Sequence, residues 1–383
     1  MKHIFTIFSC VCHCEADEHR LKQSMFLAAM IALFLFLPLH ASAQTKEIVS
    51  EGAYNMGDGE TPSVAESRAL LNAKRIALEQ AGTYVESYTK VENFQLTKDE
   101  IQVLASGIME VEILDKKRTI VGDGFRFWVK IKARVNPDRI QEMAKKVKDK
   151  SVVEDYKKIQ EAYDKSQREI GELKKQLAQA KGEEEKKQVE AKITDDERMF
   201  QANEWFAKGY QHTLNNEYDK AIEAYTRAIA LNPNIAGAYY GRGVAYYNKG
   251  QYDRAIEDYN KAIALSPNIA ETYSNRGIAY VKKGQHDRAI KDFNKAIALN
   301  PNIAGAYSNR GGAYVKKGQH DRAIKDFNKA IALNPNDASA YTNRGVAYYE
   351  KGNMGRAISD LQKACDLGDE NGCKGLKMVL ENR

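Results

Sequence analysis

The sequence lacks three features that would place it in other classes of protein. It has only 7 prolines in 383 residues, and its runs of Ala, Lys, Glu and Ile favour helices over a proline-rich disordered chain. It has no large surplus of one charge, because 58 basic and 52 acidic residues leave a net charge of +6, so we expect no nucleic-acid partner. A mean hydropathy of -0.57 excludes a multi-pass membrane protein. The length calls for two to three domains.

Catalytic motifs are also missing. No Ser/His/Asp set, metal-ligand spacing or phosphate-binding loop converges anywhere in the sequence. We therefore predict that the protein is not an enzyme and that it needs no cofactor. Cys10, Cys12 and Cys14 form a Cys-x-Cys-x-Cys cluster, which is a weak indication of a metal site.

The first 43 residues have the pattern of a secretory signal. Basic residues around Arg20 precede an apolar run over residues 25–39, and Ala-Ser-Ala follows at residues 41–43. The apolar run is shorter than the roughly 20 residues that a membrane-spanning helix needs. We expect residues 1–43 to be cleaved, with membrane association only through this segment if it is retained. The predicted location is periplasmic or secreted.

Residues 44–150 have the pattern of a small α+β domain. Asp123-Gly124 is a hairpin-turn dipeptide, and apolar and basic residues alternate from Phe125 to Val135 as in a half-buried strand. The basic outward face of this strand is interpreted as a solvated surface in preference to an anionic docking surface. Thr97 and Glu100 predict a capping box. Thr61-Pro62 predicts the start of a helix with Ile76 as a knob beside a small-residue seam, made by Ala65, Ala69, Ala73, Ala77 and Ala81.

Residues 151–201 are predicted to form a helical coiled-coil linker. Apolar and small residues recur in heptads at Tyr156, Ile159, Tyr163, Ser166, Ile170, Leu173, Leu177 and Ala180. Two interpretations stay open: self-association into a homo-oligomer through residues 151–180, or a single charged helix that separates two domains. A break or kink is expected around Lys181-Gly182.

Residues 202–371 contain an internal repeat with a period of 34 residues. Asn/Ser-Pro-Asn recurs at residues 232, 266, 300 and 334, and tyrosine recurs at residues 239, 273, 307 and 341. This spacing predicts five helical hairpins that stack into a right-handed α-solenoid, which makes the protein mainly α. Asp253, Asp287 and Asp321 are placed as N-caps of the second helices. Residues 372–383 are expected to form a helix that caps the open end.

The repeat resembles the tetratricopeptide repeat (TPR). The third unit shows the family pattern at Tyr273, Gly277, Tyr280, Ala289, Phe293, Ala296 and Pro301. The chain departs from the pattern at the seventh position, where Arg242, Arg276, Arg310 and Arg344 replace the usual leucine. Because Asp258, Asp292, Asp326 and Asp360 recur sixteen residues later, we predict an intramolecular Arg–Asp ladder in preference to ligand binding.

The resemblance also implies which residues face a ligand in the concave groove. The ligand-facing positions of the family's first helices correspond here to Tyr240, Tyr247, Asn275, Lys282, Asn309, Lys316, Asn343 and Tyr349. Carboxamides can bond a peptide backbone, and the lysines can pair with acidic groups. The alternative is that the asparagines only satisfy neighbouring groups of their own chain.

A second, more diffuse resemblance concerns the N-terminal domain. About 90 residues resemble the N-terminal domain of flagellar assembly protein T and related bacterial envelope lipoproteins, through Glu51-Gly52, the alanine-rich helix with Arg68 and Lys74-Arg75, Gly82, Val85, Ser87, Thr89, Val91 and the closing strand. The resemblance implies a place in the bacterial cell envelope and an assembly or binding role.

The last two cysteines, Cys365 and Cys373, lie at the end of the fifth unit. Their spacing resembles that of secreted cysteine-rich helical repeats, which implies a disulfide between the second helix of unit five and the final helix. A metal or thiol-redox role is the alternative interpretation.

These patterns together predict an exported, non-enzymatic adaptor that binds a peptide or protein segment in the concave TPR groove. The alternative function is a structural or assembly subunit of the cell envelope or flagellar apparatus that oligomerises through the coiled coil.

Overall fold

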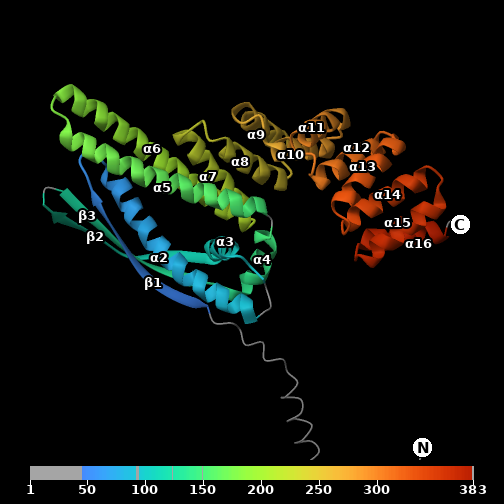
Figure 1. The fold of residues 1–383 in the computed structure, drawn as a ribbon, viewed down its shortest axis with the longest axis horizontal. Coiled ribbons are helices and arrows are strands. Elements are labelled where there is room, and N and C mark those ends of the chain that lie inside the picture. The colour runs from blue at the N-terminus through green and yellow to red at the C-terminus, as the bar shows by residue number, and fades with distance from the viewer. Residues whose placement is uncertain (1–44, 92–94, 123, 149, 382–383) are drawn as a thin grey trace, which may run out of the picture.

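The computed structural model describes residues 45–91, 95–122, 124–148 and 150–381. The signal segment predicted for residues 1–43, with its three cysteines, lies outside the described residues and stays a prediction. A sheet-containing N-terminal part is followed by a long array of helices, which extends away from it in a curve (Figure 1). Within the described part of the chain, no helix is both long and apolar enough to span a membrane.

The N-terminal part combines a three-stranded antiparallel sheet with helices on one of its faces. The strand order is β1-β3-β2, and the predicted β2–β3 hairpin is confirmed. Its elements are β1 (Lys46–Met56), α2 (Pro62–Val91), α3 (Lys98–Ile108), β2 (Met109–Val121), β3 (Gly124–Val135), the short 3₁₀ helix η1 (Pro137–Arg139) and α4 (Ile140–Val147). The capping box of Thr97 and Glu100 is confirmed at the start of α3.

Helix α2 lies against the sheet through its row of alanines. Ala65, Ala69, Ala73, Ala77 and Ala81 are all fully buried, as the sequence predicts. The approach is so close that a Cβ added at Gly52 of β1 would lie 2.2 Å from the backbone nitrogen of Ala73. The prediction for Ile76 was wrong: its side chain is 42% exposed and lies outside the buried alanine row.

The outer face of the sheet carries basic side chains that pair with carboxylates of the neighbouring strands. Lys130 lies 3.1 Å from Glu51, and Arg134 lies 3.0 Å from Glu112. Lys132 pairs in the same way with Glu47 of β1. These pairs neutralise much of the basic row, which supports its interpretation as a solvated face of the sheet.

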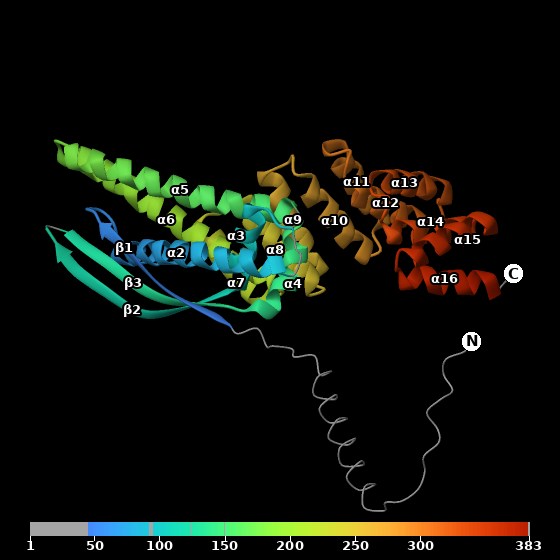
Figure 2. The same cartoon turned by 60° about the horizontal axis from the view of Figure 1, so that its bottom comes forward.

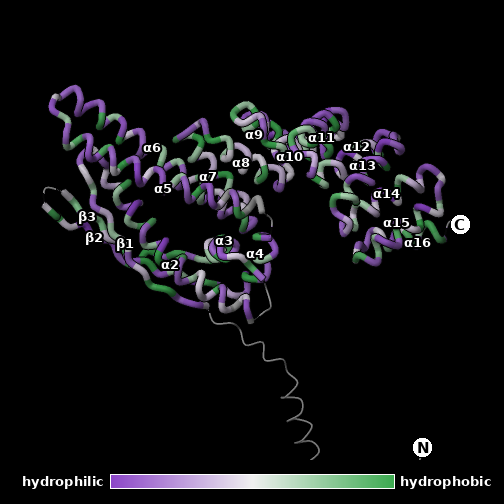
Figure 3. Tube along the Cα trace, in the orientation of Figure 1, coloured by the Kyte–Doolittle hydropathy of each residue, from purple (hydrophilic) through white to green (hydrophobic). Residues whose placement is uncertain are grey.

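The predicted linker does not separate two domains. Helices α5 (Lys150–Gln179) and α6 (Glu183–Leu214) reverse direction at Lys181-Gly182 and form a hairpin that lies on the face of α2 opposite the sheet (Figures 1 and 2). The turn end of this hairpin is hydrophilic (Figure 3). Six heptad residues are buried inside the chain, namely Tyr156, Ile159, Tyr163, Ser166, Ile170 and Leu177.

This burial corrects both interpretations of residues 151–180. Ile159 and Tyr163 pack with Val64 of α2 and Phe200 of α6, and Ile170 packs with Ile193 of α6. The heptad face is therefore occupied within one chain, which removes the surface proposed for self-association. The chain also has no break at the predicted boundary between residues 201 and 202, because α6 continues through it. The last turns of α6 serve as the first helix of the repeat array.

A buried arginine joins the α5–α6 hairpin to the N-terminal part. The side chain of Arg68, on α2, is fully buried, and its Nη2 lies 2.8 Å from Asp196 of α6 and 3.2 Å from the Ser166 hydroxyl of α5. Its guanidinium also lies over the ring of Phe200, 4.4 Å from the centroid. Glu197 of α6 fixes the start of α2, because it accepts hydrogen bonds from the backbone nitrogen and the hydroxyl of Thr61.

The repeat array consists of helical hairpins that stack side by side. After the last turns of α6, its helices are α7 (Tyr218–Leu231), α8 (Ala236–Asn248), α9 (Tyr252–Leu265), α10 (Ala270–Lys282), α11 (His286–Leu299), α12 (Ala304–Lys316), α13 (His320–Leu333), α14 (Ala338–Glu350) and α15 (Met354–Asp366). Gly277 permits close packing within a hairpin, since an added Cβ would lie 2.8 Å from Phe293. Gly250 and its repeats at 284, 318 and 352 have positive φ, which lets each first helix end in a tight turn.

The N-cap prediction for Asp253, Asp287 and Asp321 was wrong. The second helices α9, α11 and α13 have glutamine at the N-cap, with no side-chain capping bond. Each aspartate is the second residue of its helix and forms an ion pair with a lysine of the following unit. These lysines are Lys283, Lys317 and Lys351, so the aspartates connect neighbouring units.

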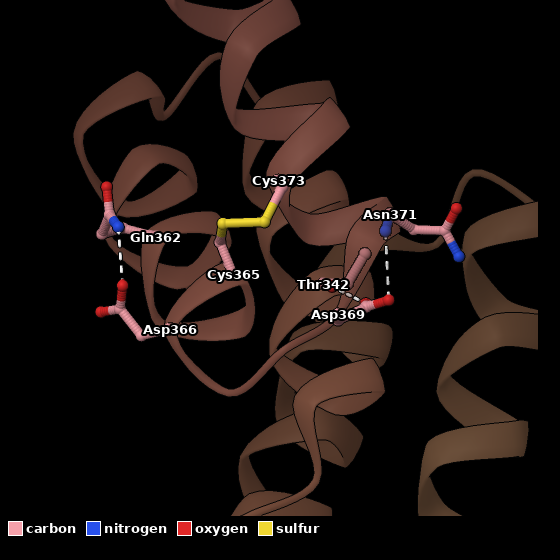
Figure 4. Close-up of a disulfide and its surroundings, with 7 residues drawn as sticks. All are labelled: Thr342, Gln362, Cys365, Asp366, Asp369, Asn371 and Cys373. Carbon is pink, nitrogen blue, oxygen red and sulfur yellow. Dashed lines mark hydrogen bonds between the residues drawn. A yellow bond between two sulfur atoms is a disulfide. The ribbon is translucent and has the colours of Figure 1, made fainter. Parts of the chain in front are cut away.

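The array ends in α16 (Glu370–Glu381), which packs on α14 and α15. Figure 4 shows the disulfide between Cys365 of α15 and Cys373 of α16, whose Cα atoms lie 4.6 Å apart. Asp369 bonds the Thr342 hydroxyl of α14 and the backbone nitrogen of Asn371, which fixes the turn between the two helices. The last hairpin is thus covered and covalently closed.

Candidate functional site

The first helices of the units form the inner side of the curved array. Each first helix packs against the next, α6 on α8, α8 on α10, α10 on α12 and α12 on α14, and neighbouring elements lie closest on the inside of a curved stack. We call the solvent-facing surface of α8, α10, α12 and α14 the inner face. All eight residues predicted to contact a ligand lie on these four helices.

Three of the eight predicted residues take part in the packing of the array itself. The Nδ2 of Asn275 donates to the Tyr240 hydroxyl at 2.8 Å, and the Tyr240 ring lies 6.1 Å from that of Tyr259. The Tyr247 ring lies 5.4 Å from that of Tyr252, and burial raises the pKa of Tyr247. For Asn275, the structure therefore favours the alternative that the carboxamide satisfies a neighbouring group of its own chain.

The remaining five predicted residues, in units three to five, form fewer hydrogen bonds and ion pairs within the chain. Among the described residues, Asn309 and Asn343 form no side-chain hydrogen bond, and Lys282 and Lys316 form no ion pair. Both lysines are exposed, whereas the adjacent Lys283 and Lys317 pair with the preceding unit. Tyr349 is half-buried. The inner face of these units thus offers two carboxamides and two ammonium groups.

Glycines keep the same stretch of the inner face flat. A Cβ added at Gly305 or Gly312 of α12 would meet no atom within 4 Å, so neither glycine is required by packing inside the chain. Gly312 occupies the position of Ile278 in the preceding unit and of Val346 in the following unit, and Val346 is 38% exposed. Backbone is therefore accessible between two apolar side chains, which is a surface that another backbone can approach closely.

The predicted Arg–Asp ladder is confirmed beneath this face. Arg310 binds Asp326 through two hydrogen bonds of 2.7 Å, and its Nη1 donates to Asn294 of the preceding unit at 2.6 Å. The same geometry recurs at Arg242, Arg276 and Arg344. Hydrogen bonding to Asp326 raises the pKa of Arg310. Each arginine is thus committed to joining two helices of its own unit and the unit before it.

The structure also contains a cleft that the sequence did not reveal. It has a volume of about 470 Å³ and lies where α2, α5, α6 and the start of α7 meet, with the α3–β2 junction on one side. Lys74-Arg75 was noted in the sequence only as part of the envelope-protein resemblance. No sequence pattern marks the cleft, because its lining comes from segments that the folding back of α5 and α6 brings together.

No group of three or more His, Cys, Asp or Glu side chains in the described ranges could hold a metal ion. Buried ionisable groups such as Asp258 and Arg68 are paired within the chain. The candidate site consists of the inner face and the junction cleft.

A curved stack of antiparallel helical hairpins with a 34-residue period defines a helical-repeat scaffold. Family models described as "TPR repeat" and "Tetratricopeptide repeat" match residues 209–250, 245–284, 270–303, 293–325, 311–352 and 338–368. Residues 209–368 therefore consist of tetratricopeptide repeats, and proteins built from these repeats are generally non-enzymatic scaffolds.

Solved structures that are similar to part of this chain include the following three. The "Crystal structure of MamA protein" is 30% identical, covering 44% of this chain and 91% of that chain with a TM-score of 0.41. The crystal structure of YrrB, described as "a TPR protein with an unusual peptide-binding site", is 26% identical, with coverages of 49% and 97% and a TM-score of 0.42. MamA from Desulfovibrio magneticus RS-1 is 23% identical, with coverages of 44% and 94% and a TM-score of 0.42.

No curated protein matches the chain in sequence. The matching family models lie within residues 209–368, so they do not test the resemblance of residues 44–150 to flagellar assembly protein T. That resemblance stays a prediction.

Proposed function

We propose that the protein is an exported, non-enzymatic adaptor that binds an extended segment of another protein on the inner face of its repeat array. The observation that carries this proposal is a set of side chains in units three to five that form no hydrogen bond or ion pair among the described residues: Asn309, Asn343, Lys282 and Lys316. They lie beside accessible backbone at Gly305 and Gly312. Since the arginines beneath are already neutralised by aspartates, the free positive charge of this stretch belongs to the two lysines.

The spacing of these groups favours an extended, acidic ligand. Lys282 and Lys316 are one unit apart, and neighbouring packed helices lie about 10 Å apart. A polyproline II segment advances about 9 Å per turn of three residues, so an acidic residue at every third position meets both lysines from one face. The carboxamides of Asn309 and Asn343 can donate to and accept from the ligand backbone, which such a segment leaves unpaired.

Export is proposed on two features at opposite ends of the chain. The signal pattern of residues 1–43 directs a chain out of the cytoplasm. Cys365 and Cys373 form a disulfide, and disulfides persist mainly in oxidising compartments such as the periplasm. The alternative of an oligomerising structural subunit rested on residues 151–180, whose heptad face is buried within the chain.

A designed peptide tests the charge of the inner face. We expect a peptide of repeated Glu-Pro-Pro to bind, and the corresponding Gln-Pro-Pro peptide to bind much more weakly. In the double variant Lys282→Gln and Lys316→Gln, two exposed ion pairs are lost, so the affinity measured by calorimetry at low salt is expected to fall about tenfold.

Lys291 and Lys325 provide a matched control. They are also exposed and one unit apart, but they lie on the second helices α11 and α13. Their replacement by glutamine is expected to leave the affinity for the Glu-Pro-Pro peptide within about twofold of that of the unchanged protein. Equal losses in the two double variants would mean that the peptide responds to net charge alone, and would refute binding at the inner face.

A further inference from the structure

The junction cleft is separate from the inner face and has no role in the function proposed above. Its walls are α2 on one side and α5 and α6 on the other, so it lies between the N-terminal part and the start of the repeat array. Its volume of about 470 Å³ falls within the range of small-molecule binding sites.

The lining of the cleft is divided between apolar and charged groups. Helix α2 contributes Leu71, Lys74, Arg75 and Leu78, which the helical spacing places on one face. Helix α5 contributes Tyr156, Ile159 and Tyr163, all of them buried. An amphiphilic molecule fits such a lining, because its apolar body gains from contact with Leu71, Leu78 and Ile159 while its charged group needs a partner.

Most cations that line the cleft already have partners within the chain. Arg75 forms an ion pair with Asp164 of α5, and Arg139 donates to the side chain of Asn215. Lys220 lies 3.1 Å from Glu217, and Lys208 lies over the ring of Trp205, 4.3 Å from its centroid. These four groups are therefore committed to holding the surrounding elements in place.

Lys74 differs from these cations. Within the described part of the chain, its ammonium group forms no hydrogen bond and no ion pair, although the side chain is half-buried. Burial lowers the pKa of Lys74, Glu204 opposes this effect from α6, and Lys208 adds to it. Glu204 also lines the cleft, but neither it nor another described residue accepts a hydrogen bond from Lys74. A cation in this position gains from an incoming anion, because the anion supplies that acceptor.

We propose that the junction cleft binds an organic anion with an apolar body, whose carboxylate pairs with Lys74 and whose body contacts Leu71, Leu78 and Ile159. A medium-chain fatty acid has this chemistry. The ligand would lie between α2 and the α5–α6 hairpin and would stabilise their contact by binding only the folded arrangement.

Calorimetric titration of the full chain with decanoate tests the proposal. We expect saturable binding of one decanoate per chain, with decanol weaker because it lacks the charge and with acetate not binding because it lacks the apolar body. In Lys74→Met the affinity for decanoate is expected to fall about tenfold or more, since a hydrogen bond to a charged group is lost, while Lys74→Arg stays within about twofold.

Two controls separate this role from damage to the fold. Lys192→Met removes an exposed lysine of α6 that does not line the cleft, and is expected to bind decanoate unchanged. Lys74→Met should melt at the same temperature as the unchanged protein or higher, because it removes a half-buried charge that has no ion pair among the described residues. Absence of saturable decanoate binding, equal affinities for decanoate and decanol, or an unchanged affinity in Lys74→Met would overturn the proposal.

Discussion

Replacement of Asp196 by alanine is expected to lower the free energy of unfolding by about 3–5 kcal/mol. The variant leaves the guanidinium of Arg68 fully buried, with the Ser166 hydroxyl and, at 3.9 Å, the carboxylate of Glu60 as its remaining polar partners. Glu60 is itself engaged by the Tyr54 hydroxyl and by Lys174. Urea unfolding followed by tryptophan fluorescence measures the effect, because Trp128 and Trp205, the two tryptophans of the chain, lie in this half of the molecule.

A double variant shows whether the loss arises from an unpaired charge. Burial raises the pKa of Asp196, which means that its charged form is costly to bury even with Arg68 beside it. The combination Arg68→Met and Asp196→Leu removes both charges and is expected to regain most of the lost stability. If the double variant were as unstable as Asp196→Ala, the loss would arise from packing and not from electrostatics.

Replacement of Asp326 by alanine is expected to cost about 2 kcal/mol of stability in unit four. It removes both hydrogen bonds between Arg310 and Asp326. Arg310, 18% exposed, keeps its hydrogen bond to Asn294 and its position over the Tyr307 ring, 5.5 Å from the centroid. The cost is smaller than for Asp196 because water reaches the arginine. Amide hydrogen exchange in α12 and α13 should accelerate about thirtyfold, which corresponds to this free energy, while exchange in α2 stays unchanged.

The exposed Lys–Asp ion pairs between neighbouring units supply the comparison for this prediction. Lys317→Met breaks the ion pair with Asp287, whose side chain is 79% exposed, and should change stability by less than about 1 kcal/mol. The apolar pair Arg310→Leu with Asp326→Leu is expected to restore protection to near that of the unchanged protein. A larger effect of Lys317→Met than of Asp326→Ala would contradict the assignment of the buried ladder as the stronger connection.

The sequence predicts most of the repeat array because the information is local and repeated. The period of 34 residues places every hairpin. The departure of Arg310 from the family pattern, with Asp326 recurring sixteen residues later, suffices to predict their contact. The alanine row of α2 is predictable for a similar reason, since small residues at helical spacing require a close neighbour. Contacts set by the register between units are not visible in this way, so Asp253 was placed as an N-cap although it pairs with Lys283.

The sequence does not predict what covers an apolar helix face. The heptads from Tyr156 to Leu177 show correctly that one face of α5 is buried, but a second copy and the chain's own α2 and α6 satisfy that pattern equally well. Arg68 gave no signal of burial because a lone arginine in a helix is usually solvated. The junction cleft is unpredictable for the same reason, as it depends on where the α5–α6 hairpin folds back.

Substitutions of open glycines test the adaptor proposal most directly. Gly305 and Gly355 are each the second residue of a 13-residue helix with free space around them, but Gly305 lies on the inner face and Gly355 on the second helix of its unit. A bulky side chain at either position therefore disturbs the fold equally little. We predict that Gly305→Tyr and Gly312→Tyr weaken binding of the Glu-Pro-Pro peptide about tenfold or more, whereas Gly355→Tyr leaves it unchanged. Unchanged affinity in both inner-face variants would show that the ligand binds elsewhere.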